Sequence, residues 1–238
     1  MVPDGRASSL MSTLFRERLA SLHAGEPQLG VDGTRHQIDA TTRISPVEGV
    51  ALVHLVAQVA ATRTLEVGLG YGFSTAYLLA ALANRQQPEA VSHDAIDPFQ
   101  FSDWNGIGIT TAMDLVATSP WLSDSSFHCI HERSDIALAG LLKAGRVFDL
   151  TFIDGFHRFD DVLVDFTLAA QMCPMGGVIV LHDMWLPGIA SIAGFVRSNR
   201  SDFTEVQTGC ENLFAVQRVG EDVRTWDHFE PFATEFGE

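Results

Sequence analysis

The amino-acid sequence predicts a single doubly wound α/β domain with a seven-stranded, mostly parallel sheet. From Thr64 onward, short apolar runs alternate with segments of helical periodicity, a pattern typical of a parallel sheet covered by helices on both faces. The last two apolar runs follow one another without a helix between them, so the last strand should be antiparallel. The seven expected strands are Thr64–Gly68, Ser92–Pro98, Phe127–His131, Phe148–Asp154, Gly177–His182, Phe203–Thr208 and Leu213–Val219.

The segments between these strands carry apolar residues at three- and four-residue spacing, which predicts amphipathic helices. A further helix should precede the first strand. It begins after Ser45, because a capping serine, Pro46 at the first helical position and Glu48 three residues after the cap are typical of helix starts. This helix should run to about Ala61 and pack on the sheet. The other expected helices are Phe73–Asn84, about Trp104–Thr118, Asp135–Ala144, Phe159–Met172 and Gly188–Asn199.

Two less regular segments flank the domain expected at residues 45–220. Residues 1–44 contain one short helical pattern near Ser12–His23, followed by several glycines and a proline, and we expect them to form an N-terminal helical cap or lid. Residues 221–238 combine six acidic residues with one arginine and four aromatic residues. This acidic aromatic tail is either a solvated end or an aromatic strap, and we expect it to be solvated or loosely docked.

The composition of the 238 residues excludes several classes of protein. With 46% hydrophobic and 19% charged residues, the chain has the composition of a folded protein. The net charge of −15 would repel nucleic acid and anionic membranes, so neither is expected as a partner. Cys129, Cys173 and Cys210 are odd in number and widely spaced, which argues against a disulfide framework or a cysteine-based zinc site. The N-terminus lacks the apolar run of a signal peptide or membrane span, so a cytoplasmic location is expected.

A glycine-rich loop lies between the first expected strand of the sheet and the helix that follows it. Gly68, Gly70 and Gly72 recur at two-residue spacing, as expected where a ligand approaches the backbone closely. The dinucleotide fingerprint places its third glycine one position later, where this chain has Phe73. Glu66 beside the loop would repel a pyrophosphate but would suit a ligand with an ammonium or sulfonium charge. S-adenosylmethionine carries that charge and no phosphate.

This loop resembles the first motif, E-x-G-x-G-x-G, of the class I S-adenosylmethionine-dependent methyltransferases. The resemblance implies a Rossmann-like methyltransferase fold in which Glu66 and the three glycines border the methyl donor. It also implies that Asp97, at the end of the second strand, accepts hydrogen bonds from the ribose hydroxyls. Ser134 and Asp135 would border the adenine, although simple helix capping explains these two residues equally well.

Polar clusters follow two neighbouring strands of the predicted sheet. Asp154 and His157 come after one buried strand, and His182 and Asp183 end the next. The carboxyl ends of parallel strands meet at one edge of a sheet, where open α/β sheets bind ligands. We therefore expect these four side chains to converge beside the methyl donor.

The patterns I-D-G-x-H and G-G-x-I-x-x-H-D, which contain these residues, resemble the small O-methyltransferases related to the catechol and macrolide-sugar enzymes. The resemblance implies that Asp154, His182 and Asp183 hold a divalent metal ion and that His157 is the general base. The chain departs from this branch at His182, where the metal-dependent members have a carboxylate. Magnesium prefers oxygen ligands, whereas an added imidazole favours manganese, iron or zinc.

The expected activity is therefore methyl transfer from S-adenosylmethionine to a hydroxyl of a small-molecule acceptor, assisted by a divalent metal such as Mg or Mn. A metal-independent N- or carboxyl-methyltransferase of the same fold is an alternative, as is a catalytically inactive donor-binding protein. An NAD-dependent dehydrogenase is a further alternative, which the glycine spacing and Glu66 disfavour. The apolar-rich cap suggests a homodimer.

Overall fold

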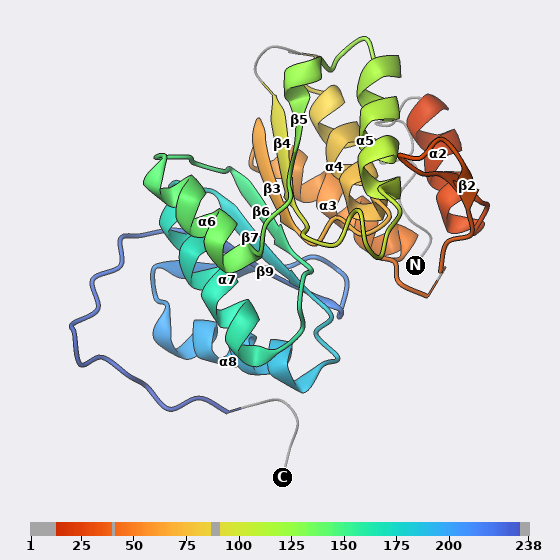
Figure 1. Cartoon of the computed structure of the whole chain (residues 1–238). Helices are drawn as coiled ribbons and strands as arrows, with labels where there is room; N and C mark the ends of the chain where they lie inside the picture. The colour runs from red at the N-terminus through yellow and green to blue at the C-terminus, as the bar shows by residue number, and fades with distance from the viewer. Residues whose placement is uncertain (1–12, 40, 87–90, 234–238) are drawn as a thin grey trace.

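The computed structural model describes residues 13–39, 41–86 and 91–233 and contains a seven-stranded sheet (Figure 1). Its strands are β3 (Arg63–Val67), β4 (Ser92–Ile96), β5 (Phe127–Ile130), β6 (Leu150–Ile153), β7 (Val178–His182), β8 (Phe203–Val206) and β9 (Leu213–Arg218). They lie in the order β5-β4-β3-β6-β7-β9-β8. The pairs from β5 to β7 are parallel, and β9 runs antiparallel to both β7 and β8. This topology confirms the predicted sheet and its antiparallel last strand.

Helices cover both faces of the sheet (Figure 1). One face carries α3 (Pro46–Gln58), α4 (Phe73–Ala83) and α5 (Ile107–Thr118), and the other carries α6 (Ser134–Lys143), α7 (Phe159–Met172) and α8 (Pro187–Asn199). Each face has its own buried apolar core. Side chains alternate along a strand, so Leu65 and Val67 of β3 join the core beneath α6, α7 and α8, whereas Thr64 and Glu66 are buried on the opposite side.

Helix α3 begins where the sequence predicts, and its first turn carries a complete capping box. The Ser45 side chain accepts a hydrogen bond from the Glu48 backbone N–H, and the Glu48 carboxylate accepts one from the Ser45 backbone N–H. Pro46 occupies the first turn, where its missing N–H is not needed. The Glu48 side chain is thereby fixed at a defined end of the helix.

Helix α5 begins at Ile107, three residues later than the sequence pattern predicts from Trp104. Asn105 and Gly106 have φ angles of +53° and +68°, so the backbone is left-handed there and cannot continue a right-handed helix. The segment before the helix forms turns instead. It reaches the carboxyl end of β4 and contributes to the functional site described below.

The N-terminal segment packs against α4 and α5. It contains α2 (Thr13–His23) and a strand pair formed by β1 (Gln28–Leu29) and β2 (Arg35–His36). The Val31 N–H donates to the Asn105 carbonyl, at 3.0 Å, which ties the strand pair to the turns before α5. The sequence predicted the helix but not the strand pair, because two-residue strands show no alternation. Residues 1–12 and 40 of the expected cap lie outside the described residues.

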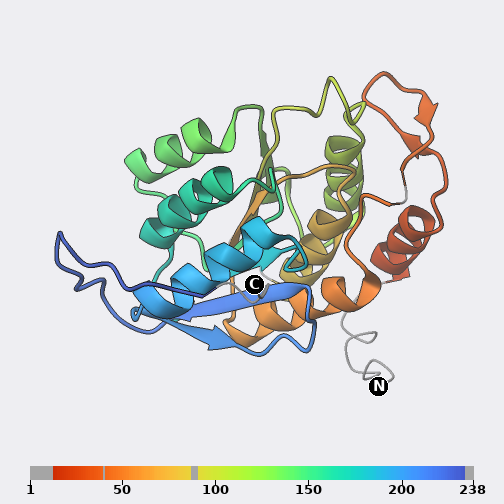
Figure 2. The ribbon, with the colours of Figure 1, turned by 90° about the horizontal axis from the view of Figure 1, so that it is seen from below.

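The described part of the C-terminal tail passes alongside α8 (Figures 1 and 2). Asn199 holds it through two hydrogen bonds, donating to the Glu230 carbonyl at 2.9 Å and accepting from the Glu230 N–H at 2.8 Å. Phe232 packs edge-on against Phe195 of α8, whereas Trp226 is 98% exposed. The tail is thus attached to α8 around Glu230 and Phe232, whereas Phe229, which packs against Phe232, is still 64% exposed.

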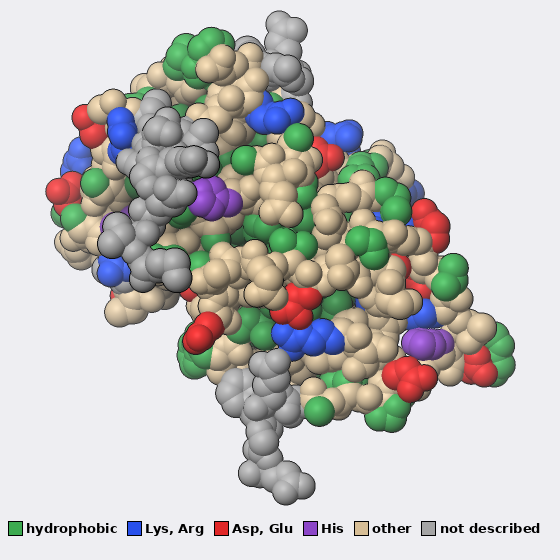
Figure 3. Space-filling view, turned by 180° about the vertical axis from the view of Figure 1, so that it is seen from behind, with side chains coloured by type: hydrophobic (Ala, Val, Ile, Leu, Met, Phe, Trp, Pro, Cys, Tyr) green, Lys and Arg blue, Asp and Glu red, His purple; other side chains and the backbone are tan. Residues whose placement is uncertain are grey.

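On the face shown in Figure 3, the acidic and basic side chains of the described residues are interspersed, and the basic ones form no continuous patch. None of the helices within residues 13–39, 41–86 and 91–233 is long and apolar enough to cross a membrane.

Candidate active site at the carboxyl edge of the sheet

A cavity of about 730 Å³ opens at the carboxyl ends of β3, β4, β6 and β7. This is the edge at which the sequence predicted the functional residues to meet. The cavity is lined on one side by Gly68, Gly70 and Asp97, and on another by Asp154, His157 and the residues around them. The glycine loop and the polar strand ends therefore share one cavity.

Gly68 allows the ends of β3 and β6 to approach closely. Its φ angle is +96°, and a Cβ at this position would lie 2.2 Å from the carbonyl oxygen of Asp154. A side chain is excluded on both counts. The loop continues through Gly70, whose φ is +51° and whose Cβ position is open, to Gly72, which caps α4 from outside the cavity lining.

Asp97 is held at the cavity wall by hydrogen bonds to both of its oxygens. Its Oδ2 accepts from the Gly70 N–H and from the Gln100 amide, each at 2.9 Å. Its Oδ1 accepts from the Phe99 N–H at 2.8 Å. Asp97 is only 3% exposed, yet it lines the cavity directly above the glycine loop. This fixed carboxylate is suited to accept hydrogen bonds from a ligand's hydroxyl groups.

Glu66 lies beneath the glycine loop and does not line the cavity. Strand alternation turns its side chain toward α4, where it accepts a hydrogen bond from the Thr75 hydroxyl and contacts His93 Nε2 at 3.2 Å. The side chain is fully buried. The expectation that Glu66 faces a ligand's positive charge therefore does not match its placement, because the carboxylate supports the loop from below.

Ser134 and Asp135 line the cavity from the first turn of α6. The Asp135 carboxylate receives two hydrogen bonds from the Arg133 guanidinium, at 3.1 and 3.2 Å. The sequence left cavity contact and helix capping open for these residues. The structure places them at the cavity, and the α6 N-cap residue is Arg133, which makes no side-chain capping bond.

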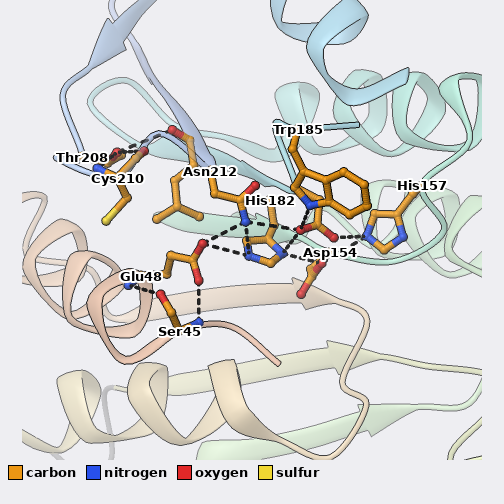
Figure 4. Close-up of polar contacts among 11 residues, drawn as sticks. Ser45, Glu48, Asp154, His157, His182, Trp185, Thr208, Cys210 and Asn212 are labelled. Atoms are coloured by element: carbon orange, nitrogen blue, oxygen red, sulfur yellow. Dashed lines mark hydrogen bonds and ion pairs between the residues drawn. The ribbon is translucent and has the colours of Figure 1, made fainter. Parts of the chain in front are cut away.

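Asp154, His157 and His182 lie together at the ends of β6 and β7 (Figure 4), and Asp183 directly follows His182. His182 Nδ1 lies 2.9 Å from Asp154 Oδ1 and 3.4 Å from Asp183 Oδ1. His157 Nε2 lies 3.0 Å from Asp183 Oδ2 and 3.4 Å from Asp154 Oδ1. The two carboxylates thus lie between the two imidazoles, as the strand-end argument predicted.

Two further residues, which the sequence analysis did not place here, belong to the cluster (Figure 4). Asn212 Nδ2 lies 2.8 Å from Glu48 Oε1, 3.2 Å from His182 Nε2 and 3.3 Å from Asp183 Oδ1. Glu48 Oε1 lies 3.5 Å from His182 Nε2. In the sequence, the capping box already explained Glu48, so nothing pointed to a second role. Asn212 precedes β9, and only the strand register, which pairs Leu213 with His182, brings it to the site.

Trp185 also contributes to this cluster. Its indole Nε1 donates a hydrogen bond to Asp183 Oδ1 at 2.9 Å. The ring itself is 65% exposed and lines the cavity mouth. The indole therefore fixes the Asp183 carboxylate and leaves its face available to a bound molecule.

The carboxylates raise the pKa of both histidines in the cluster. Hydrogen bonds to Asp154 and then Asp183 raise the pKa of His157 to about 9. Burial lowers the pKa of His182, but hydrogen bonds to Asp154 and Glu48 outweigh it and raise that pKa to about 10. Burial likewise opposes ionisation of Glu48, yet hydrogen bonds from His182 and Ser45 lower its pKa to about 2. In the absence of a bound cation, the cluster is therefore an ion-paired network.

We expect chelator-treated protein to lose stability as the pH rises from 6.5 to 9. Both histidines have pKa values in the folded protein, about 9 and about 10, that lie above the ordinary value of 6.5. Their contribution to the free energy of unfolding is therefore complete below pH 6.5 and declines as the pH rises toward these values. After a discount for the exposure of His157, the loss should be roughly 2–3 kcal/mol, or a melting temperature lower by about 5–10 °C. Thermal unfolding across this range measures it, and a melting temperature that rises over the same interval would contradict the assignment.

The donor set suits a divalent metal ion. Asp154, His182 and Asp183 each offer one ligand atom, and these atoms all lie within 4.8 Å of one another. Two carboxylates and one imidazole favour a metal such as manganese, iron or zinc over magnesium. The far nitrogen of His182 faces Glu48, which reproduces the carboxylate–histidine arrangement found behind metal-binding histidines. The residues present therefore fit a metal ion.

Comparisons with known proteins agree with this fold. The sequence model of a family described as "Methyltransferase domain" matches residues 65–184. The O-methyltransferase TomG from Streptomyces achromogenes, solved with SAM and involved in tomaymycin synthesis, superposes with a TM-score of 0.60 at 21% identity, covering 90% of this chain and 94% of its own. An O-methyltransferase from Bacillus cereus in complex with SAH superposes with a TM-score of 0.61 at 16% identity, covering 92% and 93%.

A SAH-bound methyltransferase from Podospora anserina superposes with a TM-score of 0.61 at 13% identity, covering 87% of this chain and 88% of its own. A search of curated proteins gave no match. At these identities the superpositions establish a shared fold over nearly the whole chain.

Proposed function

The chain belongs to the methyltransferase-domain family whose model matches residues 65–184, and from this premise we propose that it transfers a methyl group from S-adenosylmethionine to a hydroxyl of a small molecule with the help of a divalent metal ion. The observation that carries the proposal is the shared cavity. A glycine loop with a fixed carboxylate lines one wall, and a histidine held between two carboxylates lines another.

The chemistry of the donor wall supports an adenosyl ligand. Gly68 and Gly70 leave the loop backbone free of side chains, and Asp97 offers a fixed acceptor for ribose hydroxyls. Ser134 and Asp135 lie at the same cavity, in position to border the adenine. S-adenosylmethionine supplies an activated methyl group on a sulfonium centre, so the protein has to align the reactants and remove one proton.

His157 is the group best placed to take that proton. Its Nε2 faces Asp154 and Asp183 inside the cavity, and these carboxylates would stabilise the imidazolium that forms. Asp154, His182 and Asp183 would hold the metal ion, which would lower the pKa of an acceptor hydroxyl and help to orient it. A positive ion at the carboxylates would also weaken their hold on the His157 proton, so that the imidazole is free to accept one near neutral pH.

The lining of the acceptor side of the cavity supports a small-molecule acceptor. Trp185 and Leu186 offer apolar surface beside His157, and Thr41, Thr42 and Arg43 contribute polar groups from the N-terminal segment. The net charge of −15 and the interspersed surface charges support a small neutral or cationic acceptor over a nucleic acid.

Isothermal titration of S-adenosylmethionine into the purified protein, before and after chelation, tests the proposal when the metal content is measured on the same sample. We expect donor binding in both samples and a stoichiometric divalent ion before chelation. Donor binding without any metal would contradict the metal-assisted mechanism and leave a metal-independent methyltransferase of the same fold. Binding of NAD with no binding of S-adenosylmethionine would overturn the function itself.

Replacing Asp97 with alanine should weaken the binding of S-adenosylmethionine by roughly 1–3 kcal/mol, because a charged hydrogen-bond acceptor is lost. The same titration measures the effect. Asp97→Asn, which retains one acceptor oxygen, should bind with intermediate affinity, and Asp103→Ala, on an exposed neighbouring turn outside the cavity lining, should bind like the wild type. Unchanged affinity in Asp97→Ala would remove Asp97 from the donor site.

A further inference from the structure

We propose that Glu48, in the first turn of α3, is the positioning residue that orients His182 toward the metal ion. This inference rests on the proposed function, because it concerns the metal site of the same cavity. The sequence explains Glu48 completely as half of a capping box. In the structure, the carboxylate oxygen that does not take part in the capping box, Oε1, lies near His182.

The two nitrogens of His182 have different surroundings. Nδ1 faces the proposed ligands Asp154 and Asp183, at 2.9 and 3.4 Å. Nε2 faces Glu48 Oε1 at 3.5 Å and Asn212 Nδ2 at 3.2 Å. A neutral imidazole binds metal through a nitrogen that carries no proton, so the proton must then lie on Nε2 and needs an acceptor there.

Glu48 is the acceptor that this arrangement requires. Asn212 Nδ2 lies 2.8 Å from Glu48 Oε1 and 3.3 Å from Asp183 Oδ1. Because both neighbours are carboxylate oxygens, which only accept hydrogen bonds, the amide group must point its NH₂ at them. Asn212 therefore cannot accept the Nε2 proton through the same atom. Its contact with Glu48 instead holds Oε1 near the ring.

The helix start holds this carboxylate in place. Glu48 Oε2 accepts from the Ser45 N–H, so one oxygen is anchored while the other points at His182 (Figure 4). A carboxylate in the first turn of a helix also lies at the positive end of the helix dipole. The side chains of Glu48 and His182 are only 10% and 6% exposed, so water competes weakly for their contact.

Without a carboxylate at position 48, the opposite tautomer is favoured. An Nδ1–H would then donate to Asp154 Oδ1 at 2.9 Å, and Nε2 would accept from Asn212 at 3.2 Å. In that state Nδ1 of His182 carries a proton, so it has no lone pair with which to bind the metal ion. Glu48 thus acts on metal affinity through His182 while remaining outside the ligand set.

Titration of Mn²⁺ into the chelator-treated full chain tests this assignment, with Mn²⁺ paramagnetic resonance as the spectroscopic readout. Glu48→Gln retains the oxygen that accepts from Ser45 but presents an amide N–H to His182. We expect Mn²⁺ affinity to fall by about 10–100-fold, the usual effect of losing the partner of a metal-binding histidine. The nitrogen coupling from His182 in the Mn²⁺ spectrum should weaken, whereas affinity for S-adenosylmethionine should not change.

Ser45→Ala is the matched control, because it removes the other half of the capping box and leaves Glu48 Oε1 in place. It should lower the melting temperature but keep the wild-type Mn²⁺ affinity. A second test uses His182→Asp, because a carboxylate ligand has no imidazole tautomer for Glu48 to select. Adding Glu48→Gln to that variant should not lower its Mn²⁺ affinity further, and this test remains informative where Glu48→Gln alone folds poorly.

Wild-type Mn²⁺ affinity in folded Glu48→Gln would overturn the inference and leave the proposed function intact. An equal loss of affinity in Ser45→Ala would also overturn it, because the effect would then follow from the helix start alone. Failure of the wild type to bind Mn²⁺ while it binds S-adenosylmethionine would remove the metal site and this inference together, but not the methyltransferase activity.

Discussion

Replacing His157 with alanine is expected to lower methyl-transfer turnover by about 10²–10⁴-fold, the range typical of losing a general base. His157 Nε2 contacts Asp183 Oδ2 at 3.0 Å at the wall of the cavity, and no hydrogen bond joins its side chain to the glycine loop or to Asp97 among the contacts of the described residues. Affinity for S-adenosylmethionine should therefore be retained. Single-turnover rates measured at saturating donor, together with a donor titration, separate the two quantities.

His54→Ala is the matched control for this experiment, since His54 is an exposed histidine on α3 and does not line the cavity. It should turn over like the wild type. The pH–rate profile gives a further readout, because the limb that reports deprotonation of the base should disappear in His157→Ala. Wild-type turnover in that variant would exclude His157 from the mechanism.

Replacing Gly68 with alanine should destabilise the protein by about 3–5 kcal/mol and lower its melting temperature by roughly 10 °C. The new Cβ would lie 2.2 Å from the Asp154 carbonyl oxygen, and the φ of +96° is unfavourable for any side chain. Neither backbone can move away easily, because β3 and β6 are paired in the same sheet. Thermal unfolding of the ligand-free protein measures the loss.

Gly70→Ala separates the two causes of this loss. Gly70 has a φ of +51°, but its Cβ would have nothing within 4 Å, so only the backbone preference of about 1–2 kcal/mol should be lost. If Gly70→Ala were as damaging as Gly68→Ala, the collision with Asp154 would not be the dominant effect. The closeness of β3 to β6 would then need a different explanation.

The sequence predicted most of the sheet because its signals are local. Alternation of apolar runs with helical periods locates β3 to β9, and the strand-end rule predicts from the sequence that Asp154, His157, His182 and Asp183 lie together. These predictions need only the order of the elements and the direction of each strand. Their success follows from the parallel arrangement of β3, β4, β6 and β7.

The residues that the sequence misplaced depend on side-chain direction or on register. Glu66 stands beside the loop in sequence, but alternation along β3 turns it under the loop toward Thr75. Glu48 carries two roles on one carboxylate, and the helix cap explains it without the second. Asn212 is far from His182 in sequence, and no local pattern indicates that the two meet.

The antiparallel direction of β9 has a consequence for how this site should be compared between relatives. In a parallel strand, the residue at the end of the strand lies at the carboxyl edge of the sheet. In β9, which runs the opposite way, the residue just before the start of the strand lies there. The pairing of Leu213 with His182 fixes the position of this residue along the edge. The intervening α8 and β8 can lengthen or shorten without disturbing the pair. In a homologue, the counterpart of Asn212 should therefore be sought opposite the last residue of β7 by ladder position, since counting residues along the chain would lose it at the first insertion.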